Sequence, residues 1–351
     1  MAGPITAKEV ARRAEVSVGT VSRVFNNHSN VSEELRQHVL KVAADLGYTR
    51  PGSLAGWTPG QVIKEICFLH YQKKEAVSSP PLDSAWVSIF SGVEREARRS
   101  TIKLTYRVLL EEEASSQQLL PFLAEARPGG LLLVGPAPRE TVRMLQSTGL
   151  PLILVNQSFP DFSPSIDAIL GDNLQGTRLA MEHLLEMGHR RIAFIGGEGP
   201  TQSHKSYAIQ QRWSSYCMTL LDYGLSIDPA LVEASDQSIE SGYVACQHLL
   251  TRQANFSAIF CTEEAMALGA LQALREAGRA VPSDVSLISF GASELTRHIT
   301  PALTSVSVNT DQLGAIAVRA LLTRAANPEA PPVTHLLGAT LLKHASVAFK
   351  G

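Results

Sequence analysis

The stretch from Val16 to Asn27 reads VSVGTVSRVFNN, and its apolar residues recur at the spacing of a helix. Val21, Val24 and Phe25 fall at positions i, i+3 and i+4, so they share one face that can pack on a core. The opposite face carries small residues, hydroxyls and one guanidinium, which can approach phosphates and base edges closely. This pattern predicts a short helix suited to a groove of DNA.

The first fifty residues predict three helices around this stretch. Thr6 and Glu9 have the spacing of a capping box at the start of the first helix. Ser17 is the predicted N-cap of the second helix, and Ser32 that of a third helix, which ends at Gly47. Apolar residues at helical spacing in the third helix are expected to bury the backs of the first two.

The length and composition of the chain predict a folded protein of two or three domains. The 351 residues are 44% hydrophobic and include 31 basic and 33 acidic side chains. Residues 1–50 carry seven Lys or Arg and five Asp or Glu, a net charge of +2 that leaves −4 for the rest. This excess is too small to indicate DNA by itself.

The cysteines and the apolar segments of the sequence indicate the cellular compartment in which the protein is expected. Four widely spaced cysteines predict a reducing environment and no metal cluster. No apolar run follows the N-terminal basic residues, and no segment approaches the roughly 18 apolar residues of a membrane span. We therefore expect a cytosolic protein without a membrane partner.

The N-terminal residues are similar to the start of LacI/GalR-type bacterial transcription regulators. The similarity rests on Thr6, Lys8-Glu9-Val10-Ala11, Val16-Ser17, Thr20-Val21-Ser22-Arg23-Val24, Asn26, Val31-Ser32 and Leu46-Gly47-Tyr48. This resemblance implies base-reading positions at Val18, Gly19 and Arg23, of which Arg23 could bond a guanine bidentately. It further implies DNA contacts, mostly to the backbone, at Thr6, Ser17, Thr20, Ser22, Asn26 and Asn30.

Residues 50–61 form the expected linker. Members of the family usually have a short hinge helix here with a leucine in the minor groove, so the resemblance implies a DNA contact at Leu54, with Trp57 as the alternative apolar side chain. Gly52 and Gly56 each cost about 1 kcal/mol in a helix, and Pro59 disfavours helical dihedrals in the residue before it. An ordinary flexible linker therefore stays open as the alternative.

From residue 62, short apolar runs alternate with amphipathic segments, which predicts βαβ units and parallel sheets. The expected strands are Ile66–Leu69, Leu131–Val134, Leu152–Val155, Ile192–Ile195, Ala258–Cys261 and Val285–Ile288. The expected helices include Val87–Arg99, Leu174–Met187, Ser238–Leu250 and Ala265–Ala277.

This larger part also resembles the LacI/GalR type. The carrying residues include Asp172-Asn173, Gly188-His189-Arg190-Arg191-Ile192, Val281-Pro282-Ser283-Asp284-Val285 and Pro301-Ala302-Leu303-Thr304. The resemblance implies an α/β fold class: a three-helix helix-turn-helix DNA-binding domain at 1–49, a hinge at 50–61, and a periplasmic-binding-protein-like two-lobed α/β ligand domain at 62–351. Lobe one is expected at about 62–162 and 295–325, and lobe two at about 163–294 and 326–347.

Ligands of two-lobed α/β folds bind at the carboxyl ends of the strands. Sugar-binding members of the family usually have Asn-Asp where this chain has Thr262-Glu263, and an Asp where it has Gly291. These departures disfavour a simple hexose, whereas the planar fork of Arg212 would suit a carboxylate, a phosphate or a hydroxyl-rich ligand. By position, the family's pocket residues fall on Trp86, Asn156, Arg212, Gln237, Thr262 and Gly291.

Two of these residues also fit a plain structural role. Trp86 could stack on an apolar face of a ligand, but a single Trp on a helix is often part of a core. Arg212 is equally open to an ordinary surface position.

The sequence shows none of the common motifs of catalysis or metal binding. It has no GxSxG elbow, Walker loop or HExxH, its histidines are scattered singly, and the glycines near residue 196 form no dinucleotide fingerprint. We therefore expect no catalytic residue, cofactor or metal.

The expected protein is a sequence-specific transcriptional regulator, more a repressor than an activator. It would bind a near-palindromic operator in double-stranded DNA as a homodimer or higher oligomer. A small-molecule effector between the lobes, with sugar derivatives among the candidates, would control it. The alternatives are a solute-binding protein and, less expected, a cytosolic α/β enzyme.

Overall fold

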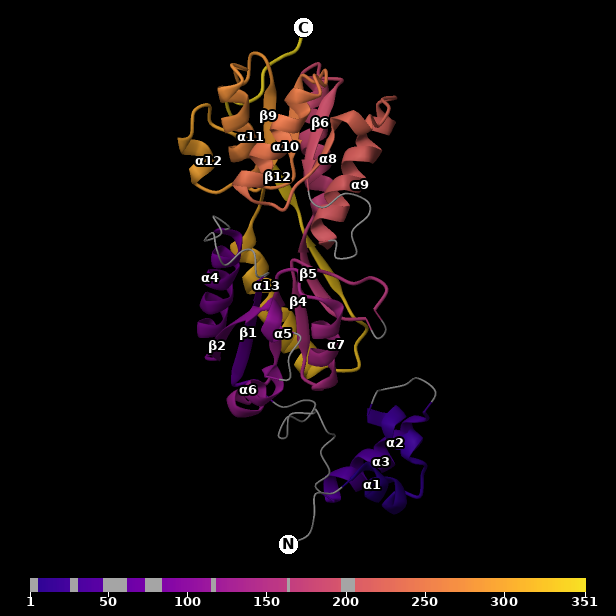
Figure 1. The fold of residues 1–351 in the computed structure, drawn as a ribbon. Coiled ribbons are helices and arrows are strands. Elements are labelled where there is room, and N and C mark those ends of the chain that lie inside the picture. The colour runs from indigo at the N-terminus through magenta and orange to yellow at the C-terminus, as the bar shows by residue number, and fades with distance from the viewer. Residues whose placement is uncertain are drawn as a thin grey trace.

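The structure is a computed structural model that describes residues 6–25, 31–46, 62–72, 84–114, 118–162, 165–196 and 206–351. These residues form a small helical domain and two α/β lobes (Figure 1). The expected hinge at 50–61 lies outside the described residues. Within the described ranges, none of the helices has the length and apolarity needed to span a bilayer.

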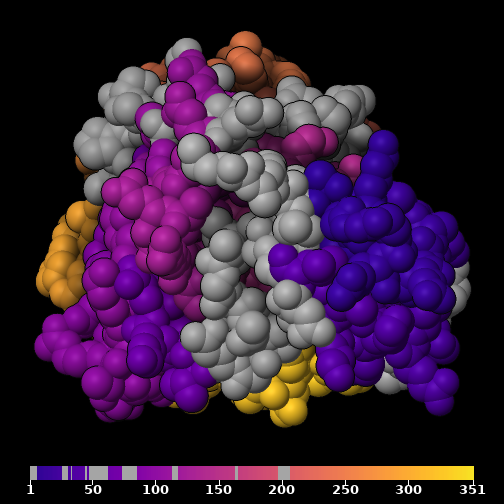
Figure 2. All heavy atoms as spheres, turned by 90° about the horizontal axis from the view of Figure 1, so that it is seen from below, coloured from indigo at the N-terminus to yellow at the C-terminus, as the bar shows by residue number. Residues whose placement is uncertain are grey.

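The N-terminal domain has the three helices that the sequence predicts, and they gather in one indigo globule in Figure 2. They are α1 (Ala7–Arg13), α2 (Val18–Phe25) and α3 (Glu33–Asp45). A shared core joins them because the buried faces of all three meet. Its buried members are Val10, Ala11, Ala14, Val21, Val24, Val31, Val39 and Ala43.

The helix starts are confirmed except for one detail. Ser17 Oγ accepts a hydrogen bond of 2.9 Å from the backbone N–H of Thr20, as an N-cap does. Thr6 stands at the N-cap position of α1, but its side chain makes no capping hydrogen bond. The predicted capping box is therefore wrong, because the Glu9 carboxylate binds Arg12 one turn later.

Within the described ranges, each lobe holds a six-stranded sheet. Sheet one has the order β11-β5-β4-β3-β1-β2 and is parallel throughout. Its strands are β1 (Glu65–Gln72), β2 (Lys103–Leu110), β3 (Leu131–Val134), β4 (Leu152–Val155), β5 (Asp167–Gly171) and β11 (Thr334–Leu337).

Sheet two has the order β12-β10-β9-β8-β6-β7 and is parallel except for β12, which runs antiparallel to β10. Its strands are β6 (Ile192–Gly196), β7 (Val232–Ala234), β8 (Ala258–Cys261), β9 (Ser286–Phe290), β10 (Thr304–Val308) and β12 (Ala339–Leu342).

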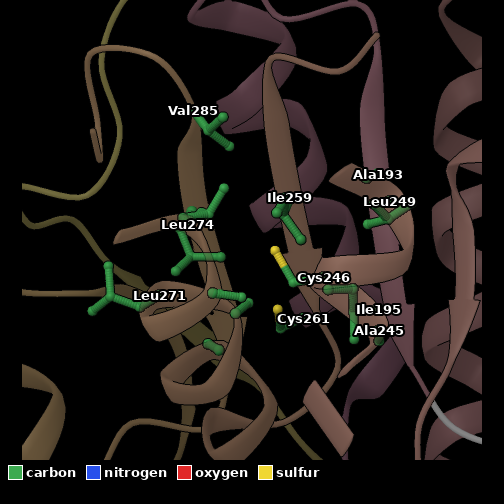
Figure 3. Packing of buried hydrophobic residues seen from close by; sticks show 14 of the residues in the cluster. Ala193, Ile195, Ala245, Cys246, Leu249, Ile259, Cys261, Leu271, Leu274 and Val285 are labelled. Carbon is green, nitrogen blue, oxygen red and sulfur yellow. The ribbon is translucent and has the colours of Figure 1, made fainter. Parts of the chain in front are cut away.

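Helices cover both faces of each sheet, which explains why the central strands are apolar along their whole length. In Figure 3, Ile259 and Cys261 of β8 lie among Cys246 and Leu249 of one helix and Leu274 of another. The helices of lobe one are α4 (Ser84–Arg99), α5 (Glu111–Ala114), α6 (Leu119–Ala126), α7 (Arg139–Ser147) and α13 (Thr310–Ala326). Those of lobe two are α8 (Asn173–Glu186), α9 (Tyr207–Asp222), the 3-10 turn Pro229–Leu231, α10 (Ile239–Thr251), α11 (Glu264–Glu276) and α12 (Leu295–His298).

The chain crosses between the lobes later than the expected boundaries near residues 162, 295 and 326. β5 and β11 belong to sheet one and β10 belongs to sheet two, so each of the three was assigned to the wrong lobe. The reason is that each of these strands completes its pairing in one sheet before the chain crosses. Their mixed sequences DAILG, TSVSV and THLL gave no strong strand signal.

These crossings orient the two sheets. β5 ends at Gly171 and α8 begins in the other lobe at Asn173, while β10 ends at Val308 and α13 begins at Thr310. Neighbouring parallel strands end at the same edge of a sheet, so the carboxyl-terminal edge of each sheet is turned toward the other lobe. Residues that follow strands in either sheet therefore lie on the faces between the lobes.

Glycines let α4 pack closely against α13 in lobe one. A Cβ on Gly92 would lie 1.9 Å from the carbonyl oxygen of Asp311, and one on Gly314 would lie 2.0 Å from that of Ile89. Such distances are far below van der Waals contact, so only glycine fits there. This contact fixes α4, which begins at the carboxyl-terminal edge of sheet one.

Candidate DNA-binding surface and effector site

The predicted recognition helix is α2, and its two faces differ as expected. Val21 and Val24 are buried in the domain core, whereas Val18 is 44% exposed. Gly19, Ser22 and Arg23 are exposed as well, and Thr20 is partly exposed. The outer face is therefore small and polar, which allows close approach to a DNA groove.

The polar groups of this face are connected to one another. Ser17 Oγ lies 2.9 Å from Thr20 Oγ1, and Arg23 Nε donates a hydrogen bond of 3.2 Å to the carbonyl oxygen of Gly19. The Arg23 guanidinium thus lies along the helix, beside the hydroxyls. Thr6 is exposed at the start of α1. The predicted contacts at Asn26, Asn30 and Leu54 lie outside the described residues.

Trp86 lies in the first turn of α4 within an aromatic cluster of lobe one. Its ring stacks on that of His70, with centroids 4.7 Å apart, and lies nearly parallel to that of Tyr106, at 6.3 Å. Phe68 and Phe90 complete the cluster. Trp86 is partly exposed, while His70 is buried and burial lowers its pKa to about 4. The wall that His70 and Trp86 offer is therefore uncharged at neutral pH.

Asn156 follows β4 with a positive φ of 59°, a conformation that non-glycine residues seldom adopt. Gln157, the next residue, was missed by the sequence analysis. It is 4% exposed, and neither its Oε1 nor its Nε2 has a hydrogen-bond partner among the residues that the structure describes. A glutamine after a strand carries no signal of its own in the sequence, so only the tertiary structure singles it out.

Arg212 projects from α9 and is almost completely buried in lobe two. Its Nε donates a hydrogen bond of 2.9 Å to Asn173 Oδ1. Its Nη1 donates to the carbonyl oxygen of Thr262 and, at 2.5 Å, to Glu263 Oε1. The guanidinium carbon lies 3.7 Å from the centroid of the Phe290 ring, a cation–π contact. Arg212 is thus a buried, fixed group and not an ordinary surface arginine.

The other three predicted effector residues of lobe two differ in their exposure. Thr262 is fully buried, and its hydroxyl points to Met266 Sδ at 3.8 Å, so only its carbonyl takes part in the Arg212 cluster. Gly291 follows β9 with φ 94°, and Gln237 is exposed just before α10 with φ 76°. The side chain of Thr262 therefore supports the wall from behind.

The structure brings Arg212 and Thr262 together in lobe two and places Trp86 and Asn156 at the facing edge of lobe one. Three groups that the sequence did not single out as effector contacts complete the lobe-two cluster. Asn173 and Glu263 lie in stretches that align with motifs of the family, and Phe290 ends β9. Their contacts with Arg212 join segments far apart in the chain, which no local pattern reports.

An exposed helix face on a three-helix domain, joined to two lobes with polar groups at facing sheet edges, defines a class of protein. It is a DNA-binding protein with a ligand-binding domain. Residues 6–51 match the family described as bacterial regulatory proteins, lacI family, and residues 181–347 match a periplasmic binding protein-like domain.

Known proteins are similar to this chain over nearly its whole length. The ribose operon repressor of Haemophilus influenzae is 30% identical over 342 residues, which cover 97% of this chain and 98% of that protein. The transcriptional repressor PurR of Escherichia coli is 28% identical over 347 residues, covering 98% and 97%. The chain therefore belongs to the LacI family of bacterial transcriptional regulators.

Solved structures agree with this assignment. The transcriptional regulator CelR in complex with cellobiose has a TM-score of 0.73 and 28% identity, over 97% of this chain and 99% of that one. The lac repressor dimer bound to operator and the anti-inducer ONPF has a TM-score of 0.68 and 25% identity, over 99% and 100%. The predicted fold class, a helix-turn-helix domain with two periplasmic-binding-protein-like lobes, is confirmed.

Proposed function

We propose that this regulator is a repressor that binds a near-palindromic operator as a homodimer and changes its affinity for DNA when a small molecule binds between the lobes. The observation that carries the proposal is the outer face of α2, where Ser17, Thr20 and Arg23 form one connected polar surface. A two-fold dimer presents two such helices about one helical turn of DNA apart, which requires a near-palindromic site.

The proposed DNA contacts divide by chemistry. Arg23 would read a guanine, Val18 would pack on a thymine methyl, and Gly19 would allow close approach. Contacts to the sugar-phosphate backbone would come from the remaining predicted positions, which fix the register of the helix on the duplex. These are Thr6, Ser17, Thr20 and Ser22, with Asn26 and Asn30 from outside the described residues. Leu54, which also lies outside them, would insert its apolar side chain into the minor groove.

The proposed effector contacts come from both lobes. Trp86 and Asn156 would act from lobe one, and Arg212, Gln237 and Gly291 from lobe two, with Thr262 behind them. The facing carboxyl-terminal sheet edges support this placement, and so does the cellobiose complex of CelR. A regulator of this kind works in the cytoplasm, where the chromosome lies, and we assign it no catalytic activity, cofactor or metal.

The DNA proposal is tested on the full chain with Arg23→Ala. A preferred duplex is first selected from random double-stranded DNA with the wild-type protein, and affinities are then measured by gel shift at one fixed salt concentration. Loss of a bidentate guanine contact should weaken specific binding by about 1–3 kcal/mol, roughly 5- to 150-fold. Arg98→Ala, on the exposed surface of α4, is the matched control and should bind like the wild type.

Two results would contradict this proposal. One is a wild-type protein that selects no sequence over random competitor, and the other is an Arg23→Ala variant with unchanged specific affinity. The effector is sought by a thermal-shift screen over sugars, sugar acids and nucleosides, because a ligand of the folded state raises the midpoint of unfolding. By linkage, a compound that weakens operator binding must itself bind more weakly to the DNA complex.

A further inference from the structure

The donors of Arg212 are largely occupied within the protein. An arginine side chain carries five N–H donors, and three of them already point at protein acceptors. Asn173 Oδ1 accepts from Nε, and the Thr262 carbonyl and Glu263 Oε1 both accept from Nη1. The two donors of Nη2 have no acceptor among the residues that the structure describes.

The pattern of occupied donors decides which ligand groups Arg212 can bind. A carboxylate or phosphate is usually held by two parallel hydrogen bonds, from either the Nε–Nη2 edge or the Nη1–Nη2 edge of the guanidinium. Asn173 occupies one nitrogen of the first edge, and Glu263 and Thr262 occupy one nitrogen of the second. Neither edge can hold an anion bidentately, so Nη2 is left to bond single acceptor atoms.

The charge and the burial of the Arg212 site also disfavour an anionic ligand. The Arg212 side chain is 6% exposed and lies against the Phe290 ring, so the position of the guanidinium is fixed. The carboxylate of Glu263 is 2.5 Å from Nη1, and its side chain is 32% exposed. An anion that approached Nη2 would therefore also approach this carboxylate, and like charges this close repel in a partly buried site.

We infer that Glu263 is a specificity residue that excludes anionic effectors from lobe two, so that the effector of this regulator is uncharged where it meets Arg212. The inference rests on the proposed function, since it assumes that this wall faces the effector. The ligand class is a neutral molecule that presents a hydroxyl, ether or carbonyl oxygen to Nη2. Of the three ligand groups that the sequence left open for Arg212, a carboxylate, a phosphate or a hydroxyl-rich ligand, this inference selects the hydroxyl-rich one.

The facing wall of lobe one fits the same class. His70 and Trp86 present stacked rings without charge, and Asn156 carries a neutral amide, as does Gln237 on the side of lobe two. Amides bond hydroxyl and carbonyl groups without contributing net charge. These groups therefore give a charged ligand no counter-ion to replace the one that Glu263 blocks.

The test uses inorganic phosphate as the probe and the full chain as the protein. Glu263→Ala removes the negative charge and also frees the Nη1 donor of Arg212 that Glu263 occupies, whereas Glu263→Gln removes the charge alone. Glu264→Ala is the matched control, because the neighbouring carboxylate accepts from the Ser293 backbone N–H at 2.8 Å and is not bonded to Arg212. Phosphate stabilises any folded protein somewhat by exclusion, so the difference between variants is the signal.

We expect phosphate to raise the unfolding midpoint of wild type and Glu264→Ala equally. Glu263→Ala should show an additional rise of about 2–4 °C and at least tenfold tighter phosphate binding by calorimetry, with Glu263→Gln changing in the same direction. If Glu263→Ala does not unfold cooperatively, Glu263→Gln is judged by the same criteria.

Two results would overturn the inference: Glu263 variants that bind phosphate no more tightly than wild type, or a Glu264→Ala variant that gains as much as the Glu263 variants. The titration contains no DNA, so it is separate from the operator measurement that tests the proposed function. If the protein bound no operator, the proposed function would be contradicted by the gel shift, while the phosphate titration would still test the role of Glu263.

Discussion

Arg212 Nε donates a hydrogen bond of 2.9 Å to Asn173 Oδ1, and Asn173 Nδ2 donates one of 3.1 Å to the carbonyl oxygen of Gly171. Gly171 ends β5, where the chain crosses from lobe one to lobe two. A Cβ on Gly171 would lie 3.1 Å from the side chain of Val308, so this crossing packs against the second one. The proposed effector wall is therefore bonded directly to a segment where the chain crosses between the lobes.

This relationship predicts that Asn173→Leu separates effector binding from the response. Asn173 is buried, and its loss leaves Arg212 Nε and the Gly171 carbonyl without a partner, which costs about 1–3 kcal/mol. We expect a lower urea midpoint and an operator affinity that no longer changes with the compound found in the thermal screen. Ser238→Ala, which removes the N-cap of α10, should cost about 1 kcal/mol and keep the response. A retained response in Asn173→Leu would show that the coupling runs elsewhere.

Substitution of the buried Gln157 by an apolar residue is predicted to stabilise the protein, whereas most substitutions of buried residues destabilise it. Both polar atoms of its buried amide lack partners among the described residues, and an unpaired buried polar group is destabilising. Gln157→Met keeps the length of the side chain without the amide, so the free energy of unfolding should rise by about 1 kcal/mol. The comparison is Gln210→Met on the exposed face of α9, which should stay within about 0.5 kcal/mol of wild type. A marked loss of stability in Gln157→Met alone would mean that the amide is paired.

Gly314 should respond to alanine in the opposite way to an ordinary helical glycine. Alanine in place of an exposed helical glycine stabilises by up to about 1 kcal/mol. At Gly314 the new Cβ would meet the Ile89 carbonyl at 2.0 Å, so Gly314→Ala should destabilise by about 1–3 kcal/mol. At Gly19 the nearest atom is Ser17 Oγ at 3.6 Å, so Gly19→Ala should be neutral or stabilising. Chemical denaturation of both variants checks the contrast, which equal effects would contradict.

The buried His70 predicts a pH dependence of stability. Burial lowers its pKa to about 4 from an unperturbed value of about 6.5. Between these values the unfolded chain binds more protons than the folded one, so protonation favours unfolding. The stability contributed by neutral His70 is therefore complete above about pH 6.5 and is lost as the pH falls toward 4. His70→Phe keeps a ring against Trp86 and should flatten the curve of unfolding midpoint against pH in this window.

The control for this pH series is His298→Phe, at the exposed end of α12. It should follow the wild-type curve from pH 7 to 4.5. His189, which is buried, and His183, which is partly exposed, also have pKa values lowered by burial and remain in every variant, so only the difference in slope is attributed to His70. Equal slopes in wild type and His70→Phe would refute the prediction.

The sequence by itself determined the elements that local spacing controls. Each of the six expected strands and four expected helices is present, because burial on both faces of a sheet requires continuous apolar runs and a helix brings i, i+3 and i+4 together. For the same reason, the outer face of α2, with Ser17, Thr20 and Arg23, follows from a single stretch of chain. The predicted capping box of Thr6 and Glu9 was nevertheless wrong, because Glu9 pairs with Arg12 within one turn of the helix.

Only the tertiary structure decided where the chain changes lobes and what surrounds Arg212. β5, β10 and β11 owe their sheet membership to pairing with strands distant in sequence and not to their own composition. Asn173 and Glu263 lie 39 and 51 residues from Arg212, so the bonds that occupy its donors exist only after lobe two has formed. Local periodicity carries no information on contacts at that separation, and the charge of the effector site depends on them.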